Sequence, residues 1–246
     1  RQLLQTCGIQ KSLTSLHQHN EAHKSGELVA RMLTGESIAL VSDAGTPLIS
    51  DPGFNLVAAA REHGVVVLAI AGPCAAIAAL SVAGLPTDRF VFEGFLPAKS
   101  AARRSRLENL AAEPRTLVFY EAPHRLAELL RDLVVVFGAD RKAAVSRELT
   151  KRFETTYAGS LQELCDIAAR NPDMSRGEIV VIVAGDPGSA QNATTMNADQ
   201  VLRALLDELP PSQAAKIAAK LTGEKRAAMY ERAMSLSSAR RGEADE

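Results

Sequence analysis

The sequence predicts an α/β protein with two α/β domains and a small helical domain at its end. Short apolar runs of strand length alternate with helical segments in the first third of the chain, and aromatic and β-branched runs recur in the middle. The end of the chain carries only helical patterns. With 246 residues, the chain is long enough to bury the core of one large domain or of two small ones.

The first domain, residues 1–87, is expected to contain parallel strands. Ser37–Ser42 (SIALVS) and Val65–Ile70 (VVVLAI) are short apolar runs, which are typical of strands buried on both faces of a sheet. A helix is expected between them, with Asp51 as its N-cap and Gly64 at its end. An Ala-rich helix follows the second run. This order of elements predicts a right-handed parallel α/β unit.

The second domain, residues 88–185, is expected to hold a mixed sheet. Five runs have the composition of strands: RFVFEGFLP, RTLVFYEAP, AAVSREL, RFETTYAG and GEIVVIVAG. Apolar residues between Leu126 and Phe137 recur at helical spacing and form one stripe. Residues 186–197 have the composition of a linker.

Residues 198–236 are expected to form three short helices, and residues 237–246 a disordered tail. Ala219 and Gly223 have the spacing of a helix-turn-helix motif. Five basic residues lie near this motif: Lys216, Lys220, Lys225, Arg226 and Arg232. Two interpretations stay open here, a plain helical hairpin with capping charges and a nucleic-acid contact.

The composition argues against several classes of protein. No apolar run reaches the roughly 18 residues of a membrane-spanning helix, so no membrane partner is expected. Cys7, Cys74 and Cys165 are isolated, which indicates neither a disulfide framework nor a zinc site and fits a reducing cytoplasm. The stretch HQHNEAH (His17–His23) has no Cys or carboxylate set that completes a metal site, so no metal is expected.

Basic residues are concentrated in the middle of the chain. The net charge is -1, yet residues 97–152 contain 12 Lys and Arg against 7 Asp and Glu. A basic segment in a nearly neutral protein suggests a polyanionic partner. A solvated helix face is the alternative explanation.

Two loops rich in Gly and Pro follow the expected strands of the first domain. The stretch VSDAGTPLISDPG follows the first strand and AGPCAA follows the second, so both lie at carboxyl ends, where ligands bind in parallel sheets. Neither contains a GxGxxG or Walker motif, so a diphosphate cradle is not expected. Small and rigid residues let backbone groups approach a polar ligand that is not strongly anionic, such as S-adenosylmethionine. Simple turn formation is the alternative.

Several motifs together resemble the tetrapyrrole methylase superfamily. They are VSDAGTPLISDPG, GPCAAIAALSVAGLPTDRFVFEGFLP, RTLVFYEAPHRL, RELTK and GEIVVIV, in this order along nearly the whole chain. The set is highly specific, and it is most similar to the branch that methylates the ribose 2'-hydroxyl of a cytidine in 16S rRNA. The basic helical end matches the small C-terminal domain of that branch.

The resemblance implies two α/β domains facing across a cleft, a cytoplasmic homodimer, and S-adenosylmethionine in the cleft. The substrate it implies is a cytidine in the decoding centre of the 30S ribosomal subunit. Carried over by position, the cofactor contacts are Ser42, Asp43, Ala44, Gly45, Thr46, Pro47, Leu48, Ile49, Pro73, Cys74, Ala75, Phe119 and Tyr120. Arg147–Thr150 and the strand near Val183 are further candidates. Family members begin with a strand, a TPIGNL loop and an AEDTR stretch, so the first strand is expected to be missing from this sequence.

Methyl transfer to a ribose hydroxyl is an in-line displacement, in which a protein mainly aligns the reactants and excludes water. A general base helps, because the hydroxyl is weakly acidic. The candidate bases are His124, Glu121, Glu148 and Lys151. A structural role at a helix start is the alternative for His124.

The residues expected to contact RNA are Lys99, Arg103, Arg104, Arg106, Arg125, Lys216, Lys220, Lys225 and Arg226. Arg125 and Lys151 either clamp phosphates or pair with Glu121 and Glu148.

Two other functions stay open. A methylase of small tetrapyrroles or of diphthine shares the fold, although the basic segment, the FYEAPHR run and the helical end favour RNA. A binding module without turnover also keeps the fold, and the expected absence of the first strand is consistent with it. Fold alone does not decide among the three.

Overall fold

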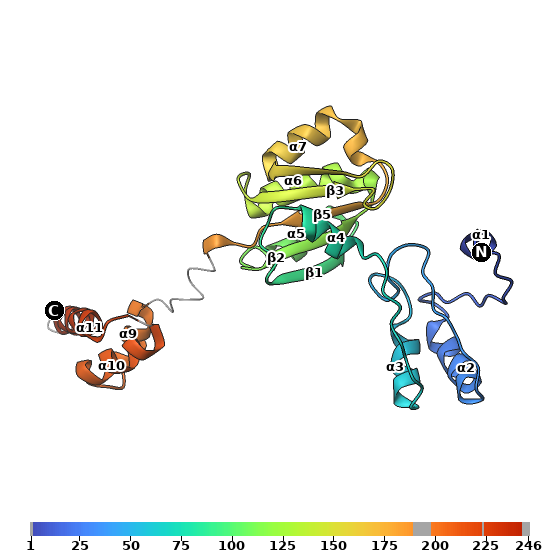
Figure 1. Ribbon diagram of the computed structural model, residues 1–246. Helices are drawn as coiled ribbons and strands as arrows, with labels where there is room; N and C mark the ends of the chain where they lie inside the picture. Colours follow the sequence, from blue (N-terminus) through green and yellow to red (C-terminus); the bar gives the residue numbers. More distant parts are fainter. Residues whose placement is uncertain (1, 189–197, 223, 243–246) are drawn as a thin grey trace.

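A five-stranded mixed sheet forms the centre of the protein (Figure 1). The computed structural model describes residues 2–188, 198–222 and 224–242. The strands are β1 (Phe90–Phe95), β2 (Thr116–Glu121), β3 (Lys142–Arg147), β4 (Thr155–Ser160) and β5 (Ile179–Val183). Their order across the sheet is β1-β2-β5-β3-β4. Each strand coincides with a run that the sequence predicts, so the mixed sheet is confirmed.

β5, the last strand in the sequence, lies in the middle of the sheet. β1 and β2 are parallel, whereas β5 pairs antiparallel with β2 and with β3, and β3 pairs antiparallel with β4. Ile179 lies opposite Glu121 of β2 and Arg147 of β3. Every residue of β5 is buried, as its unbroken apolar composition predicts. The carboxyl ends of β2 and β3 and the start of β5 therefore meet at one end of the sheet.

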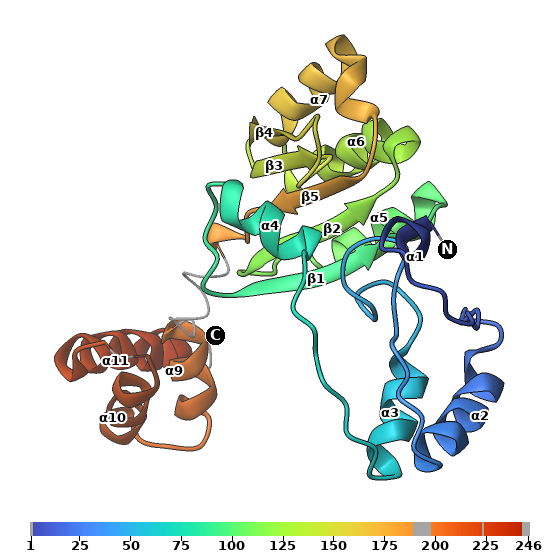
Figure 2. The ribbon, with the colours of Figure 1, turned by 45° about the vertical axis from the view of Figure 1, so that its right-hand side comes forward.

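Helices cover both faces of the sheet (Figure 2). α5 (Ser100–Glu108), α6 (Leu126–Phe137) and α7 (Leu161–Arg170) pack on one face, and α4 (Ala75–Val82) packs on the other. The predicted apolar stripe of α6 is confirmed, because Leu126, Leu129, Leu130 and Leu133 are fully buried. Burial of each such side chain stabilises the fold by about 1.5–3 kcal/mol. Short 3-10 turns at Pro123–Arg125 and Pro172–Ser175 precede α6 and β5.

A helical pair precedes the sheet. After the short α1 (Gln2–Thr6), α2 (Glu21–Leu33) and α3 (Phe54–Glu62) pack together around a small core of their own. Glu21 is 5% exposed, and its Oε1 accepts hydrogen bonds from the N–H groups of Gly53 (2.9 Å) and Asn55 (2.8 Å) at the start of α3.

This contact corrects the expectation that Asp51 caps the helix. The N-cap residue is Gly53, and it makes no side-chain cap. The first N–H groups of a helix need an acceptor and favour a negative charge nearby. Glu21, which is distant in sequence, supplies both, so Asp51 is not needed as a cap.

The strands expected at residues 37–42 and 65–70 are not formed. Neither segment has regular structure, and no backbone hydrogen bond pairs either with a neighbouring strand in the part of the chain that the structure describes. Val65 and Val67 still pack against the α2–α3 core, whereas Ile70 is 92% exposed. A strand requires a hydrogen-bonded partner, which an apolar composition alone does not supply.

The end of the chain forms a helical unit. It consists of α9 (Ala198–Leu206), α10 (Pro211–Thr222) and α11 (Arg226–Gly242). Its core contains Leu202, Ala214, Ala215, Ala218, Met229 and Ala233, which confirms the three predicted helices. The prediction that the disordered tail begins at residue 237 is wrong, because α11 continues to Gly242. Leu236 still packs on this core, and the helix propagates beyond it. Gly223 and most of the predicted linker, residues 189–197, lie outside the described residues.

None of the helices in the described ranges is both long and apolar enough to span a membrane.

Arg103 is a buried structural ion between α5 and α6. Its side chain is 1% exposed, and its Nε donates to Oδ2 of Asp132 (2.7 Å). Arg104 donates to the other oxygen of Asp132 (2.6 Å), and Arg103 Nη1 donates to the carbonyl of Ala98 (3.2 Å). The expected RNA contact of Arg103 is therefore wrong, because its guanidinium is enclosed where α5 packs on α6.

Asp132 links the stability of this cluster to pH. Burial raises the pKa of Asp132, but the hydrogen bonds from Arg104 and Arg103 outweigh it and hold the pKa below its ordinary value. A carboxyl group with a lowered pKa in the folded state contributes stability above its unfolded-state pKa. That contribution is lost as the pH falls through the folded-state pKa.

Asp132→Asn is expected to lower the free energy of unfolding by about 3–5 kcal/mol, because the buried Arg103 then keeps only its longer ion pair with Glu128 (3.4 Å). Urea unfolding at neutral pH measures the loss. The difference from the unaltered chain should shrink below about pH 4, where the carboxyl group also loses its charge. Asp140→Asn, at an exposed position, is the matched control and should change stability by less than about 0.5 kcal/mol. Equal losses in the two variants would contradict this role.

Candidate functional site

A cavity of about 340 Å³ lies where β1 and β2 end and β5 begins. Its walls come from the loop before α3, from the segment that follows β2, and from the segment that leads into β5. The lining residues are Ala44, Gly45, Thr46, Ile49, Ser50, Asp51, Ala75, Phe95, Tyr120, Glu121, Ala122, Pro123, Leu149, Gly177, Glu178, Ile179 and Val180. The carboxyl ends of parallel strands are a common position for ligands. This cavity is therefore the candidate functional site.

The two Gly- and Pro-rich bends that the sequence singles out are joined beside the cavity. Thr46 Oγ1 donates a hydrogen bond to the carbonyl of Pro73 (3.0 Å), which ties the first bend to the second. The Tyr120 hydroxyl accepts a hydrogen bond from the N–H of Ala76 (3.2 Å), which ties β2 to the first turn of α4. The Phe95 and Tyr120 rings pack edge to face, with centroids 5.7 Å apart. These contacts give the cavity an apolar wall beside exposed main-chain groups.

Backbone strain is concentrated around the cavity. Leu48 and Ser50 in the first bend have φ values of 72° and 62°, and Glu148 and Thr150 after β3 have values of 50° and 65°. Such conformations cost of order 1–3 kcal/mol each for residues other than glycine, and they persist where the surrounding structure holds them. No other described non-glycine residue has a positive φ. Strain of this kind is typical of ligand-binding loops.

Glu148 holds the wall that leads into β5. Its Oε1 accepts hydrogen bonds from the N–H of Glu178 (3.0 Å) and from Lys151 Nζ (2.9 Å). The hydrogen bond from the Glu178 N–H, helped by Lys151, lowers the pKa of Glu148. Lys151 also pairs with Glu178 (3.1 Å). Neither Glu148 nor Lys151 lines the cavity, so their side chains shape this wall and do not face the ligand space.

Glu121 lines the cavity and has an unsatisfied polar atom. Its side chain is fully buried; Oε1 accepts the N–H of Ala122 (2.7 Å) and lies 3.2 Å from Arg125 Nε. Oε2 is shielded from solvent and has no hydrogen-bond partner within the described ranges. Burial raises the pKa of Glu121, and the Ala122 N–H and the Arg125 charge oppose this shift. A buried carboxylate oxygen without a partner is costly, and a ligand donor would satisfy it.

The structure corrects two further site expectations. Phe119 is fully buried in the core under α5 and α6, because side chains alternate along β2 and Tyr120 takes the face of the cavity. Val183 lies at the far end of β5. Since β5 is antiparallel to β2, its first residues, Ile179 and Val180, line the cavity instead.

The remaining candidates lie elsewhere. His124 is exposed and does not line the cavity. Six expected cofactor contacts also do not line the cavity, although they are near it in sequence: Ser42, Asp43, Pro47, Leu48, Pro73 and Cys74. Lys99 is exposed, whereas Arg106 pairs with Glu93 (2.7 Å) and Arg125 donates to the carbonyl of Leu96 (2.8 Å). Lys216, Lys220, Lys225 and Arg226 are exposed on α10, on α11 and between them.

The lining includes residues that the sequence did not single out. They are Ser50, Phe95, Ala122, Pro123, Gly177 and Glu178, together with Asp51, which was expected only to cap a helix. Asp51 and Ser50 belong to the same Gly- and Pro-rich stretch, which was the available signal for them. Gly177 and Glu178 precede a strand whose direction only the sheet reveals.

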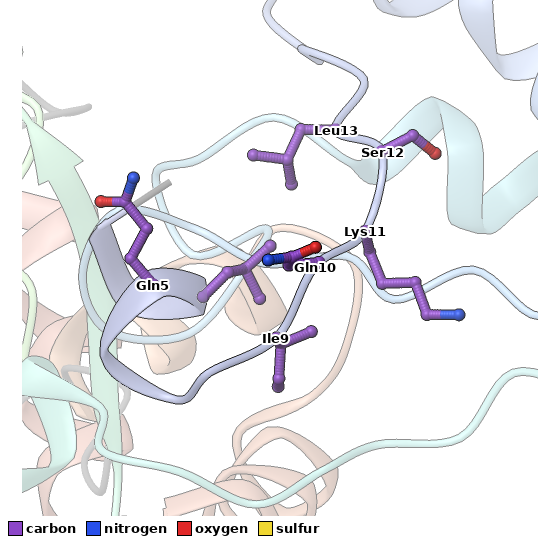
Figure 3. Close-up of a pocket in the computed structure, with 7 residues that line it drawn as sticks. Gln5, Ile9, Gln10, Lys11, Ser12 and Leu13 are labelled. Carbon is purple, nitrogen blue, oxygen red and sulfur yellow. The ribbon is translucent and has the colours of Figure 1, made fainter.

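A second hollow, of about 460 Å³, lies in the N-terminal segment. Figure 3 shows that Gln5, Ile9, Gln10, Lys11, Ser12 and Leu13 surround it from a single short stretch of chain. Functional groups from different elements do not converge there. Across the described ranges, no group of three or more His, Cys, Asp or Glu residues is placed to hold a metal ion.

Comparison with known proteins connects this site to a family. The sequence model of the tetrapyrrole (corrin/porphyrin) methylases matches residues 5–165, and that of the RsmI C-terminal HTH domain matches residues 192–237. The Xylella fastidiosa (strain Temecula1) protein named ribosomal RNA small subunit methyltransferase I is 55% identical over 94% of this chain and 84% of its own length. The Pseudomonas aeruginosa protein of the same name is 51% identical over 94% and 83%.

Solved structures show the same fold at low sequence identity. A diphthine synthase matches with a TM-score of 0.52 and 15% identity, covering 74% of this chain and 72% of its own. The methyltransferase CobJ matches with a TM-score of 0.50 and 20% identity, covering 72% and 74%.

Gly177→Ala is expected to destabilise the cavity wall. Gly177 has a φ of 77°, and a Cβ atom there would collide with the side chain of Glu148. Gly64→Ala is the matched control, because Gly64 has a similar φ of 74° but open space around it, so a Cβ atom there adds only the backbone cost of about 1–2 kcal/mol. Thermal unfolding should show a larger loss for Gly177→Ala. Equal losses would mean that Glu148 moves aside freely and does not hold the wall.

Proposed function

The chain belongs to the tetrapyrrole methylase family, and we propose that it methylates 16S rRNA of the small ribosomal subunit, using S-adenosylmethionine. The observation that carries this proposal is the extent of similarity to the two relatives. It covers 94% of the chain and continues into the helical unit, which has a family model of its own. The finer proposal is transfer to the ribose 2'-hydroxyl of a cytidine in the decoding centre, by a homodimer in the cytoplasm.

The residues of the cavity fit S-adenosylmethionine. Among the residues that the structure describes, no Lys, Arg or His lines it, whereas three carboxylate residues do, so it suits a cation better than a phosphate-bearing ligand. The buried Oε2 of Glu121 has no partner and accepts a donor. Ala44, Gly45, Thr46, Ile49 and Ala75 of the two bends line the same space. When bound, the cofactor supplies an activated methyl group.

The protein's contribution is alignment, exclusion of water and removal of a proton. Phe95 and Tyr120 form an apolar wall that keeps water out. Glu121 is the only one of the four candidate bases that lines the cavity. Its raised pKa makes the carboxylate a stronger base, so we place acceptance of the hydroxyl proton at Oε2. Glu148 and Lys151 then act by holding the wall, and His124 lies outside the site.

Labelled methyl transfer to 30S particles that lack the modification tests this function. The unaltered chain should label 16S rRNA, and mapping should place the label on a cytidine ribose. Glu121→Gln should lower the turnover rate by about 100-fold or more, because it removes the proton acceptor. Labelling of a tetrapyrrole precursor or of diphthine, but not of 30S particles, would favour the alternative enzymes. Cofactor binding without any transfer would favour a binding module.

The exposed lysines of the helical unit are proposed to contact rRNA phosphates. Lys216→Glu or Lys220→Glu should weaken RNA binding. For each lost phosphate contact, the slope of the logarithm of the affinity against the logarithm of the salt concentration should become shallower by about one unit. Lys142→Glu is the matched control, because Lys142 is exposed at the start of β3, at the end of the sheet away from the cavity. Filter binding at several salt concentrations measures both quantities. The same salt slope in all three variants would exclude these lysines from the RNA interface.

A further inference from the structure

The cavity is lined by acidic side chains. Asp51, Glu121 and Glu178 line it, and no basic side chain from the described part of the chain does. Two of these carboxylates have cationic neighbours of their own. Glu178 pairs with Lys151 (3.1 Å), and Glu121 lies 3.2 Å from Arg125. Asp51 is the remaining negative charge of the lining.

Asp51 does not cap α3, although its position in the sequence suggests this structural role. An Asp immediately before Pro and a helix normally caps that helix. Here Glu21 accepts hydrogen bonds from the N–H groups of Gly53 and Asn55. The N-cap residue of α3 itself provides no side-chain cap. Among the described residues, Asp51 makes no hydrogen bond or ion pair.

The loop that carries Asp51 lies close to β1. Ser50 has a φ of 62°, and a Cβ atom on Gly94 would lie 3.0 Å from the Ser50 hydroxyl oxygen. Since glycine is needed at position 94 for this approach, β1 and the loop are in close contact. Strain next to an unpaired carboxylate is consistent with a group placed for a ligand.

A second observation points to a ligand at the same cavity. Oε2 of Glu121 is buried without a partner, although it belongs to a different element from Asp51. One unpaired carboxylate and one unsatisfied carboxylate oxygen leave the cavity short of a positive charge and of a hydrogen-bond donor at these two positions. The ligand that completes it supplies both.

We propose that Asp51 binds a cationic group of the ligand in this cavity and thereby selects a positively charged ligand over a neutral one. The inference rests on the proposed function, in which that ligand is S-adenosylmethionine. This cofactor has two cationic groups, an ammonium on its amino-acid part and a sulfonium at the methyl-bearing sulfur. Asp51 thus adds a side-chain contact to the main-chain contacts of the two bends.

Isothermal titration calorimetry with three compounds tests the proposal without any need for turnover. S-adenosylmethionine has both cationic groups, S-adenosylhomocysteine has only the ammonium, and 5'-methylthioadenosine has neither. Asp51→Asn should weaken binding of S-adenosylmethionine about 10-fold and leave 5'-methylthioadenosine within about 2-fold of the unaltered chain. Weaker binding of S-adenosylhomocysteine as well identifies the ammonium as the partner. An effect on S-adenosylmethionine alone identifies the sulfonium.

Salt provides an independent readout. Charge pairs near the surface weaken as ionic strength rises, so the affinity of the unaltered chain for S-adenosylmethionine should fall with added salt more steeply than that of Asp51→Asn. Asp88→Asn is the control, because Asp88 is exposed and does not line the cavity. It should leave all three affinities unchanged.

Two results would overturn the inference while leaving the proposed function in place. One is an unchanged affinity of Asp51→Asn for S-adenosylmethionine; the other is an equal loss for all three compounds, which would show a contact to the adenosine. Circular dichroism and the unfolding temperature of Asp51→Asn establish that the variant is folded. If the unaltered chain binds none of the compounds, the proposed function fails, and this inference fails with it.

Discussion

The position of β5 between β2 and β3 is the constraint on which the site depends. Its five residues are buried, and they pair antiparallel on both sides. That direction places Ile179 opposite Glu121 and Arg147, so the residues that lead into β5 stand beside the ends of the neighbouring strands. The cavity exists because of this arrangement. A parallel β5 would place Val183 there instead, and the wall that Glu148 holds would lie at the other end of the sheet.

The site is built from conformations that are unfavourable in isolation. Four non-glycine residues with positive φ lie in the two loops around the cavity, and Gly94 and Gly177 allow those loops to approach neighbouring segments closely. The sheet and the helices on its faces supply the stability that offsets this strain. Rigid loops around a cavity reduce the ordering that a ligand must impose when it binds. The strained loops and the buried sheet are therefore parts of one arrangement.

Charged residues in this protein have three distinct roles, which their partners reveal. Arg103 and Asp132 neutralise each other inside the helical layer, and Glu21 caps a helix that is remote in sequence. Glu148 and Lys151 hold the wall of the cavity. Asp51, and one oxygen of Glu121, have no partner among the described residues. The charges with partners are explained by the fold, and the two acceptors without partners that line the cavity are those to which we assign a ligand.

The sequence by itself determined the strands of the mixed sheet, the apolar stripe of α6, the three C-terminal helices, and the Gly- and Pro-rich stretch that borders the site. These features depend on local composition and periodicity, which a chain shows before it folds. Only the tertiary structure decided that β5 runs antiparallel, that Glu21 and not Asp51 caps α3, that Arg103 is buried, and that residues 37–42 and 65–70 have no partner strand. Each of these depends on a contact between residues far apart in the chain, and no local pattern specifies which distant group supplies it.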